Sequence, residues 1–140
     1  MLHLSEHLRE LMVSAALAEH PLEACGVLAG PVGSDRPTRF VPLHNAAASE
    51  VFYEVAPDEL LRLYQDLDRR GEEVVVVFHS HTRTAAYPSE TDVALAAEPN
   101  AHYVLVSTAK SQQIPPAPPS LRSFRIHDGA IEEEDVVVEG

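Results

Sequence analysis

The stretch Val74-Val75-Val76-Val77-Phe78-His79-Ser80-His81 decides the fold of this chain. Its first five residues are apolar without alternation, which is typical of a central strand covered on both faces. Residues two apart on a strand point to the same face, so the imidazoles of His79 and His81 can converge on one point. The stretch therefore predicts a buried strand that ends in two side chains suited to binding a metal.

A second segment, Ser89-Glu90-Thr91-Asp92, follows His81 after seven residues and begins a helix predicted from Glu90 to Glu98. Taken alone, Ser89 and Asp92 are best explained as a capping box. A capped helix start is also a rigid mount for a metal ligand, so the two interpretations are compatible. Two imidazoles and one carboxylate make up the three protein ligands that catalytic zinc sites use. We therefore predict a zinc site at His79, His81 and Asp92.

The candidate general base is Glu23, which stands just before another apolar run, Cys25–Ala29. A carboxylate next to so apolar a segment is unusual unless it faces solvent, a partner or a site. Solvent exposure would be the favoured explanation if the downstream histidines were absent. With them present, we expect Glu23 to take a proton from the attacking water.

Helices and strands are predicted throughout the rest of the chain. A first helix is expected between Ser5, its N-cap, and Pro21. A second helix is expected between Pro57 and Gly71, and its inner face should consist of Leu60, Leu61, Leu63, Tyr64 and Leu67. Strands are expected at 25–29, 39–44, 51–55, 103–107 and in a hairpin at 121–131 that turns at Asp128-Gly129. This mixture predicts an α/β (α+β) fold, a sheet with helices packed on its faces.

The length of 140 residues predicts a single domain, 1–140. Residues 111–120 form a Pro-rich segment that we expect to be a surface loop. Residues 135–140, in the acidic tail, are expected to be frayed.

The charge balance restricts the partners. There are 10 basic and 22 acidic residues, a net charge of −12, which repels phosphate backbones and anionic lipids. We therefore expect no nucleic acid and no membrane surface as a partner, but a basic protein. The single cysteine, Cys25, cannot form an internal disulfide, and its apolar context favours a packed thiol over a nucleophile. Because the longest apolar stretch is too short to span a bilayer and lacks a basic flank, a cytoplasmic location is expected.

The whole pattern, Glu23…His79-x-His81-x7-Ser89-x-x-Asp92, resembles the JAMM (MPN-plus) family of zinc metallo-isopeptidases. The resemblance extends from the first strand to the final hairpin. It implies a cytidine-deaminase-like fold, a curved mixed sheet flanked by helices. It also implies one zinc per chain on His79, His81 and Asp92, Glu23 as general acid/base, and Ser89 as hydrogen-bond donor to the oxyanion. The family cleaves amide or isopeptide bonds at the C-terminal end of ubiquitin-like proteins.

Four segments resemble a compact bacterial branch of this family: 23–30, 79–82, 86–89 and 101–107. That branch includes hydrolases that release cysteine from a ubiquitin-like sulfur-carrier protein during cysteine biosynthesis. The resemblance thus implies a protease that hydrolyses the amide bond at the Gly-Gly C-terminus of such a carrier. The chain departs from the branch at its Pro115–Pro119 insertion, and it lacks the long insertions with which eukaryotic relatives grip a second ubiquitin.

Alternatives remain open at this point. The chain could be a general small-peptide metallo-amidase on the same scaffold, or a non-catalytic MPN assembly module, although such modules typically lack some ligand residues. A zinc deaminase is excluded, because its His-x-Glu and Pro-Cys-x-x-Cys elements are missing. The sequence leaves a homodimer open. It also does not decide whether Arg83 grips a substrate carboxylate or is only solvated.

Overall fold

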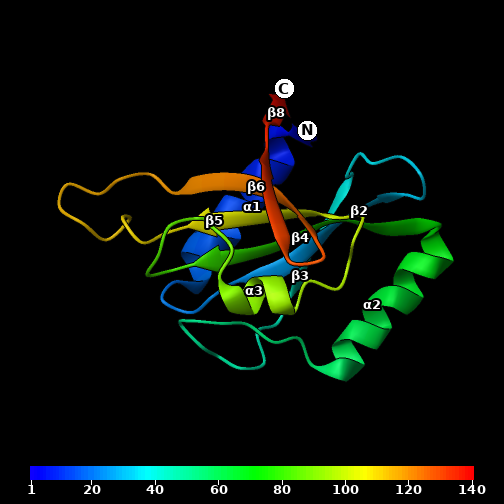
Figure 1. Ribbon diagram of the computed structural model, residues 1–140, viewed down its shortest axis with the longest axis horizontal. Helices are drawn as coiled ribbons and strands as arrows, with labels where there is room; N and C mark the ends of the chain where they lie inside the picture. Colours follow the sequence, from blue (N-terminus) through cyan, green and yellow to red (C-terminus); the bar gives the residue numbers. More distant parts are fainter.

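The computed structural model describes residues 1–140 and contains one large sheet with helices on both faces (Figure 1). The elements, in chain order, are β1 Leu2–Ser5, α1 Glu6–Glu19, β2 Cys25–Pro31, β3 Arg39–Leu43, α2 Pro57–Arg70, β4 Glu72–His81, α3 Glu90–Ala94, β5 His102–Ser107, β6 Ser120–His127, β7 Ala130–Glu134 and β8 Val136–Glu139. No helix is both long and apolar enough to cross a membrane.

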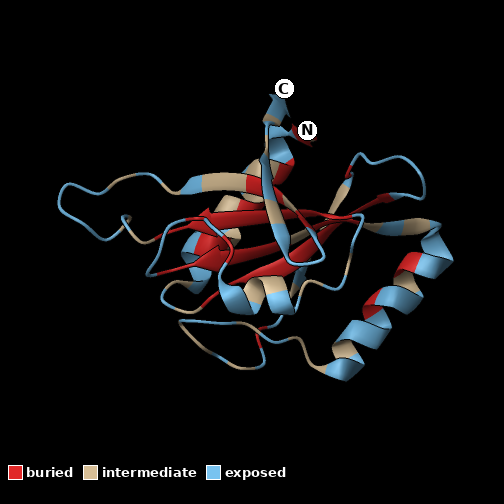
Figure 2. Ribbon diagram, viewed as in Figure 1, coloured by how far each residue is buried: buried red, intermediate tan, exposed pale blue.

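The main sheet has six strands in the order β3-β2-β4-β5-β6-β7. Only the β4–β5 pair is parallel, so the sheet is mixed, as predicted. The predicted apolar strand, β4, lies between β2 and β5 and is buried over most of its carboxyl half (Figure 2). The hairpin of β6 and β7 turns at Asp128 and Gly129, both with positive φ, which suits the Asp-Gly pair.

Helix α1 covers one face of the sheet. Its N-cap is Ser5, whose Oγ accepts a hydrogen bond from the Leu8 amide at 3.1 Å, as predicted. The buried side chains of this layer form one cluster with the sheet: Leu2, Leu4, Leu8, Met12, Ala16, Ala24, Leu28, Val75, Val76, Phe78, Val104 and Val106.

Helices α2 and α3 lie over the opposite face. Leu63 and Leu67 of α2 pack against Val27 and Ala29 of β2, and Gly71 ends the helix with a φ of 67°. The predicted inner face of α2 is only partly correct. Leu60, Leu61 and Tyr64 are exposed, and Leu60 and Tyr64 border a groove described below.

The chain termini pair with each other, which corrects the prediction of a frayed tail at 135–140. Strand β8 runs parallel to β1, and residues from Leu2 to Ser5 align with those from Val136 to Glu139. Strand β1 was not predicted from the sequence. The tail is ordered because β8 pairs with the backbone of β1, whose Leu2 and Leu4 side chains are buried in the core.

Two other predictions need correction. Residues 51–55 are not a strand, because their backbone groups bond to Asn45 and Ala46 instead. The Asn45 side chain donates to the Phe52 carbonyl and accepts the Glu54 amide, and the Ala46 amide donates to the Glu54 carbonyl. Helix α3 ends at Ala94 rather than at Glu98. Residues 111–119 belong to no helix or strand, as expected for the Pro-rich segment.

Candidate metal centre

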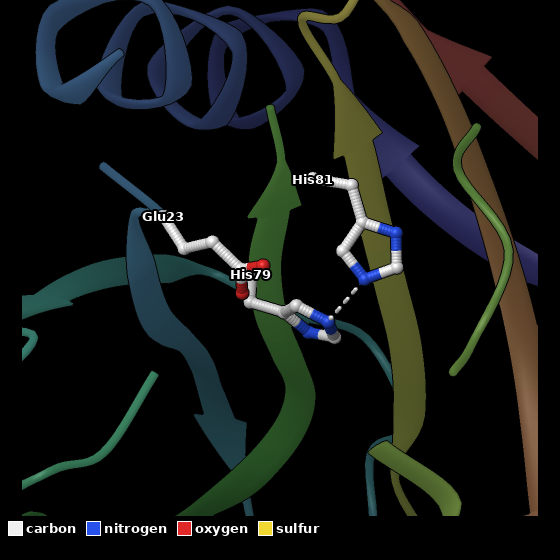
Figure 3. Close-up of side chains that lie close together, drawn as sticks. All are labelled: Glu23, His79 and His81. Atoms are coloured by element: carbon white, nitrogen blue, oxygen red, sulfur yellow. Dashed lines mark hydrogen bonds between the residues drawn. The ribbon is translucent and has the colours of Figure 1, made fainter. Parts of the chain in front are cut away.

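The register between β2 and β4 brings Glu23 to the two histidines. Cys25 pairs with His79 in antiparallel fashion, so Glu23, two residues before Cys25, comes level with His81, two residues after His79. Residues opposite each other in an antiparallel pair point to the same face. The ligand atoms of Glu23, His79 and His81 accordingly lie within 4.8 Å of one another, and all three residues are buried (Figure 3).

Three ligand atoms converge on one point. His79 Nε2 and His81 Nε2 are 3.2 Å apart, and Asp92 Oδ2 lies 3.1 Å from the first and 3.0 Å from the second. Four ligands placed tetrahedrally around zinc at its usual bond lengths are separated by about 3.3 Å. The two nitrogens and the oxygen therefore fit three corners of a zinc tetrahedron, which leaves the fourth corner free. The structure thus supports a metal at this point, with Glu23 next to it.

Asp92 is held by the start of α3. Its amide donates to Ser89 Oγ at 3.1 Å, and its Oδ2 accepts the Ser89 amide at 2.9 Å, which completes the predicted capping box. Ser89 Oγ thus serves the helix as an acceptor, and its own hydroxyl hydrogen remains available for donation.

Local contacts orient both imidazoles. His81 Nδ1 lies 2.9 Å from the carbonyl oxygen of Ala85, so its hydrogen is directed there and Nε2 is free to bind a metal. The ring of Tyr53 lies against that of His79, with centroids 4.8 Å apart. The Ala85 carbonyl thus orients the His81 ring by a hydrogen bond, whereas His79, whose buried Nδ1 has no partner, is held by ring packing.

Burial and the neighbouring charges shift the pKa values of the site. Burial raises the pKa of Glu23 to about 7, although His81 opposes the shift. Burial also lowers the pKa of His79, so the neutral, metal-binding imidazole is favoured. For Asp92, burial acts in the upward direction, but hydrogen bonds with His79 and His81 hold its pKa well below the usual range. A carboxyl group with a pKa near neutrality suits a group that takes and returns a proton.

A groove of about 670 Å³ starts at His79 and Asp92 and runs between α2 and α3. Most of its lining is apolar, and the charged residues other than Asp92 are Glu54 and Glu98. No lysine or arginine lines it. The groove can therefore take an extended, uncharged or weakly basic chain that ends at the metal centre.

Cys25, Arg83 and Tyr87 lie outside the metal centre. Cys25 is buried, and burial raises the pKa of its thiol to about 12, as expected for a packed rather than a reactive cysteine. Arg83 Nη2 pairs with Glu50 Oε1 at 3.0 Å on the surface. Tyr87 packs edge-on against Phe124, with centroids 5.4 Å apart.

Two residues next to the metal centre, Tyr53 and Asn45, were not predicted from the sequence to belong to it. Both belong to the segment between β3 and α2, part of which was predicted as a strand. The available signal was Asn45 itself, because asparagine directly after a strand commonly closes a turn with its side chain.

Known proteins resemble the chain along most of its length. The family model for prokaryotic homologs of the JAB domain matches residues 5–127. A CysO-cysteine peptidase of Mycobacterium tuberculosis is 54% identical over 127 residues, which are 91% of this chain and 84% of that protein. A desampylase of Haloferax volcanii is 34% identical over 102 residues, or 72% of this chain and 70% of that protein.

Solved structures share the fold. A protein of Desulfitobacterium hafniense superimposes with a TM-score of 0.82 at 32% identity and covers 99% of this chain and 93% of that one. A structure described as JAMM, a metalloprotease-like zinc site in the proteasome and signalosome, gives a TM-score of 0.60 at 18% identity and covers 100% of this chain and 99% of that one. These likenesses confirm the predicted fold, a curved mixed sheet flanked by helices.

Proposed function

The chain belongs to the prokaryotic JAB-domain family of JAMM-type hydrolases, and from this premise we propose that it is a zinc peptidase acting on a ubiquitin-like sulfur-carrier protein. The bond cleaved is the amide after the carrier's C-terminal Gly-Gly, and the product released is cysteine. The 54% identity to a CysO-cysteine peptidase supports this substrate class, as does the likeness to a desampylase.

The observation that carries the proposal is the convergence of His79, His81 and Asp92 beside a buried carboxylic acid. Their ligand atoms lie 3.0–3.2 Å apart. His79, His81 and Asp92 would hold a zinc ion, which would supply a Lewis acid and lower the pKa of the attacking water. Every other step is performed by side chains of this chain.

Glu23 is the proposed proton carrier. Its Oε1 is buried and has no hydrogen-bond partner, so it is available to the water that attacks the amide carbonyl. Its pKa of about 7 allows it to accept that proton and then to donate it to the departing amine. The amine leaves as the free amino group of cysteine, and the carrier retains a C-terminal carboxylate.

Ser89 is the proposed donor to the oxygen that becomes negative during the attack. Its Oγ already accepts the Asp92 amide, which fixes the hydroxyl while leaving its hydrogen free. A donor held in place in this way stabilises developing charge without reorganisation.

The groove and the charge define the carrier. An extended Gly-Gly tail lets its backbone approach the groove walls closely, because glycine has no side chain to exclude. The net charge of −12 favours a carrier with basic residues around the base of its tail.

The test is cleavage of purified carrier–cysteine adducts, followed by intact mass spectrometry. We expect the adduct to lose the mass of a cysteine residue, a chelator to abolish the loss, and Glu23→Gln to slow it by orders of magnitude. If the adduct stays intact while short peptides are hydrolysed, the general amidase interpretation replaces this proposal. If neither is cleaved, the assembly-module interpretation does.

A further inference from the structure

Asn45 forms a buried hydrogen-bonding centre between β3 and α2 that the mechanism above does not use. Its side chain is 8% exposed, and all four of its hydrogen-bonding positions are occupied. Nδ2 donates to the carbonyl oxygens of Glu23 and Phe52, each at 3.1 Å. Oδ1 accepts the amides of Ala47 and Glu54, also at 3.1 Å. One side chain thus joins the segment before β2 to both arms of the 45–54 loop.

The first consequence concerns the backbone of the proposed base. The carbonyl of Glu23 is held by Asn45, and its amide donates to the carbonyl of Ser49 at 2.9 Å. Glu23 precedes β2, so the sheet ladder itself does not fix these two groups. The 45–54 loop therefore holds Glu23 on both sides, and the Asn45 amide is the only side chain that takes part.

The second consequence concerns a metal ligand. Asn45 bonds Phe52 and Glu54, the two neighbours of Tyr53, and the Tyr53 ring lies 4.8 Å from the ring of His79. The position of Tyr53 against His79 therefore depends on the same amide that holds Glu23. The Asn45 amide therefore helps to position both the proposed base, Glu23, and one proposed ligand, His79.

We propose that Asn45 is a positioning residue that sets Glu23 against the metal ligands, and that it acts by donating both Nδ2 hydrogens to the Glu23 and Phe52 carbonyls. This inference rests on the proposed function of Glu23 as proton carrier. Asn45 itself touches neither substrate nor metal. Because proton transfer depends on the placement of the base, a small displacement of Glu23 lowers the rate strongly.

Two substitutions separate the donor role from the acceptor role. Asn45→Ala removes all four hydrogen bonds. Asn45→Asp keeps an oxygen that accepts the Ala47 and Glu54 amides but cannot donate to Glu23 or Phe52. Both variants retain the ladder between β2 and β4 and the bond from the Ala24 amide to Ser80 Oγ at 2.7 Å, so the strand after Glu23 keeps its place.

Ser123→Ala is the matched control. Ser123 is fully buried, its Oγ donates to Glu134 Oε2 at 2.7 Å, and it is not part of the groove lining. Ser123→Ala therefore loses a buried side-chain hydrogen bond, here from a hydroxyl to a carboxylate, that makes no contact with Glu23 or the 45–54 loop. Urea unfolding of all variants measures how far each substitution lowers the free energy of unfolding. The loss of kcat in each variant can then be compared with its loss of stability.

The kinetic test measures hydrolysis of the carrier–cysteine adduct at full zinc occupancy. We expect kcat to fall about 10- to 100-fold in both Asn45 variants, with KM little changed, and to be unaffected by Ser123→Ala. In a Glu23→Gln background the further loss on Asn45→Ala should nearly vanish, since the residue through which Asn45 acts is already disabled. An equal loss in both backgrounds, or a wild-type kcat in Asn45→Asp, would overturn the proposal.

Amide hydrogen exchange provides a readout that does not depend on turnover. The amide of Glu23 should exchange faster in both Asn45 variants than in the wild type or in Ser123→Ala, while the amides of β5 keep their protection. If the wild type fails to cleave the adduct, the proposed function is wrong, but exchange at Glu23 still decides whether Asn45 holds that residue. Unchanged exchange at Glu23 would refute the inference whatever the activity.

Discussion

Asp92 accepts the Ser89 amide through the same carboxylate oxygen, Oδ2, that faces both imidazoles. The amide lies at 2.9 Å, and the nitrogens of His79 and His81 lie at 3.1 and 3.0 Å. The helix cap therefore also orients the carboxylate that we propose as a metal ligand. This explains why a capping box, which alone indicates only a helix start, belongs to the site in this chain.

The shared oxygen leads to a prediction about metal content. Asp92→Asn preserves the size of the side chain and an oxygen that can accept the Ser89 amide, but it removes the charge that the metal requires. We expect the helix start to survive and zinc occupancy to fall well below one per chain, as also for His79→Ala and His81→Ala. Elemental analysis of the purified variants measures this. Glu90→Gln, next to Ser89 but outside the ligand set, should keep full occupancy; full zinc in all three ligand variants would refute the assignment.

Glu23→Gln should separate the base from the ligands. The amide is nearly isosteric with the carboxyl group but cannot take up a proton, so hydrolysis should fall by orders of magnitude while zinc occupancy stays at the wild-type level. Parallel zinc analysis and adduct cleavage test both parts. Stoichiometric zinc loss would make Glu23 a ligand, and near-normal turnover would make it a bystander.

Ser89→Ala should affect both stability and turnover, because the hydroxyl caps α3 and is the proposed oxyanion donor. Loss of the cap should cost about 1 kcal/mol of unfolding free energy, and loss of the donor should lower kcat by roughly 10²–10³-fold. Urea unfolding and adduct kinetics measure the two effects separately. Destabilisation with unchanged kcat would reduce Ser89 to a helix cap.

The convergence of His79, His81 and Asp92 was predictable because each placement depends on local periodicity or spacing. Alternation along a strand places His79 and His81 on one face, and the Ser89–Asp92 spacing marks a helix start. The contacts of Asn45 were not predictable in the same way, since Glu23 precedes β2 and Phe52 and Glu54 lie at the far end of the 45–54 loop. The error at 51–55 has the same origin. Tertiary hydrogen bonds to Asn45 override the β-propensity of Val51, Phe52 and Tyr53.

The paired termini were missed for a related reason. Nothing in the acidic tail signals that Val136–Glu139 would find an edge at Leu2–Ser5, more than a hundred residues away in sequence. Two features stabilise this junction. Leu2 and Leu4 of β1 are buried in the core, and the N-terminal ammonium group lies 2.8 Å from Glu134 Oε1. Such pairings depend on the whole fold rather than on local sequence.

The junction predicts a loss of stability in acid. Burial alone would raise the pKa of Glu134. Hydrogen bonds from the N-terminal ammonium, His102 and Ser123 outweigh this effect and lower the pKa from 4.5 to about 2. Since the folded pKa lies below the unfolded one, the contribution is complete above pH 4.5 and is lost as the pH falls toward 2. We expect Glu134→Gln to lower the unfolding free energy at pH 7 by on the order of 2 kcal/mol. Urea melts across this range should show the difference from wild type shrinking with acidity; a constant difference would contradict the ionic explanation.

The groove makes a prediction about the substrate tail. In the proposed function, the carrier tail reaches His79 and Asp92 in an extended form, and glycine lets its backbone come closest to the groove walls because it has no side chain. Replacing the penultimate glycine of the carrier by a bulky residue should therefore block cleavage, whereas a small leaving group such as cysteine should be tolerated. Because the field of a chain with net charge −12 steers a basic carrier, kcat/KM should also fall as salt rises, and kcat itself should change little. Intact mass spectrometry of wild-type and substituted carriers at low and high salt measures both effects. Normal cleavage of the bulky variant, or a preference for free dipeptides over any folded carrier, would show that the groove does not select an extended Gly-Gly tail.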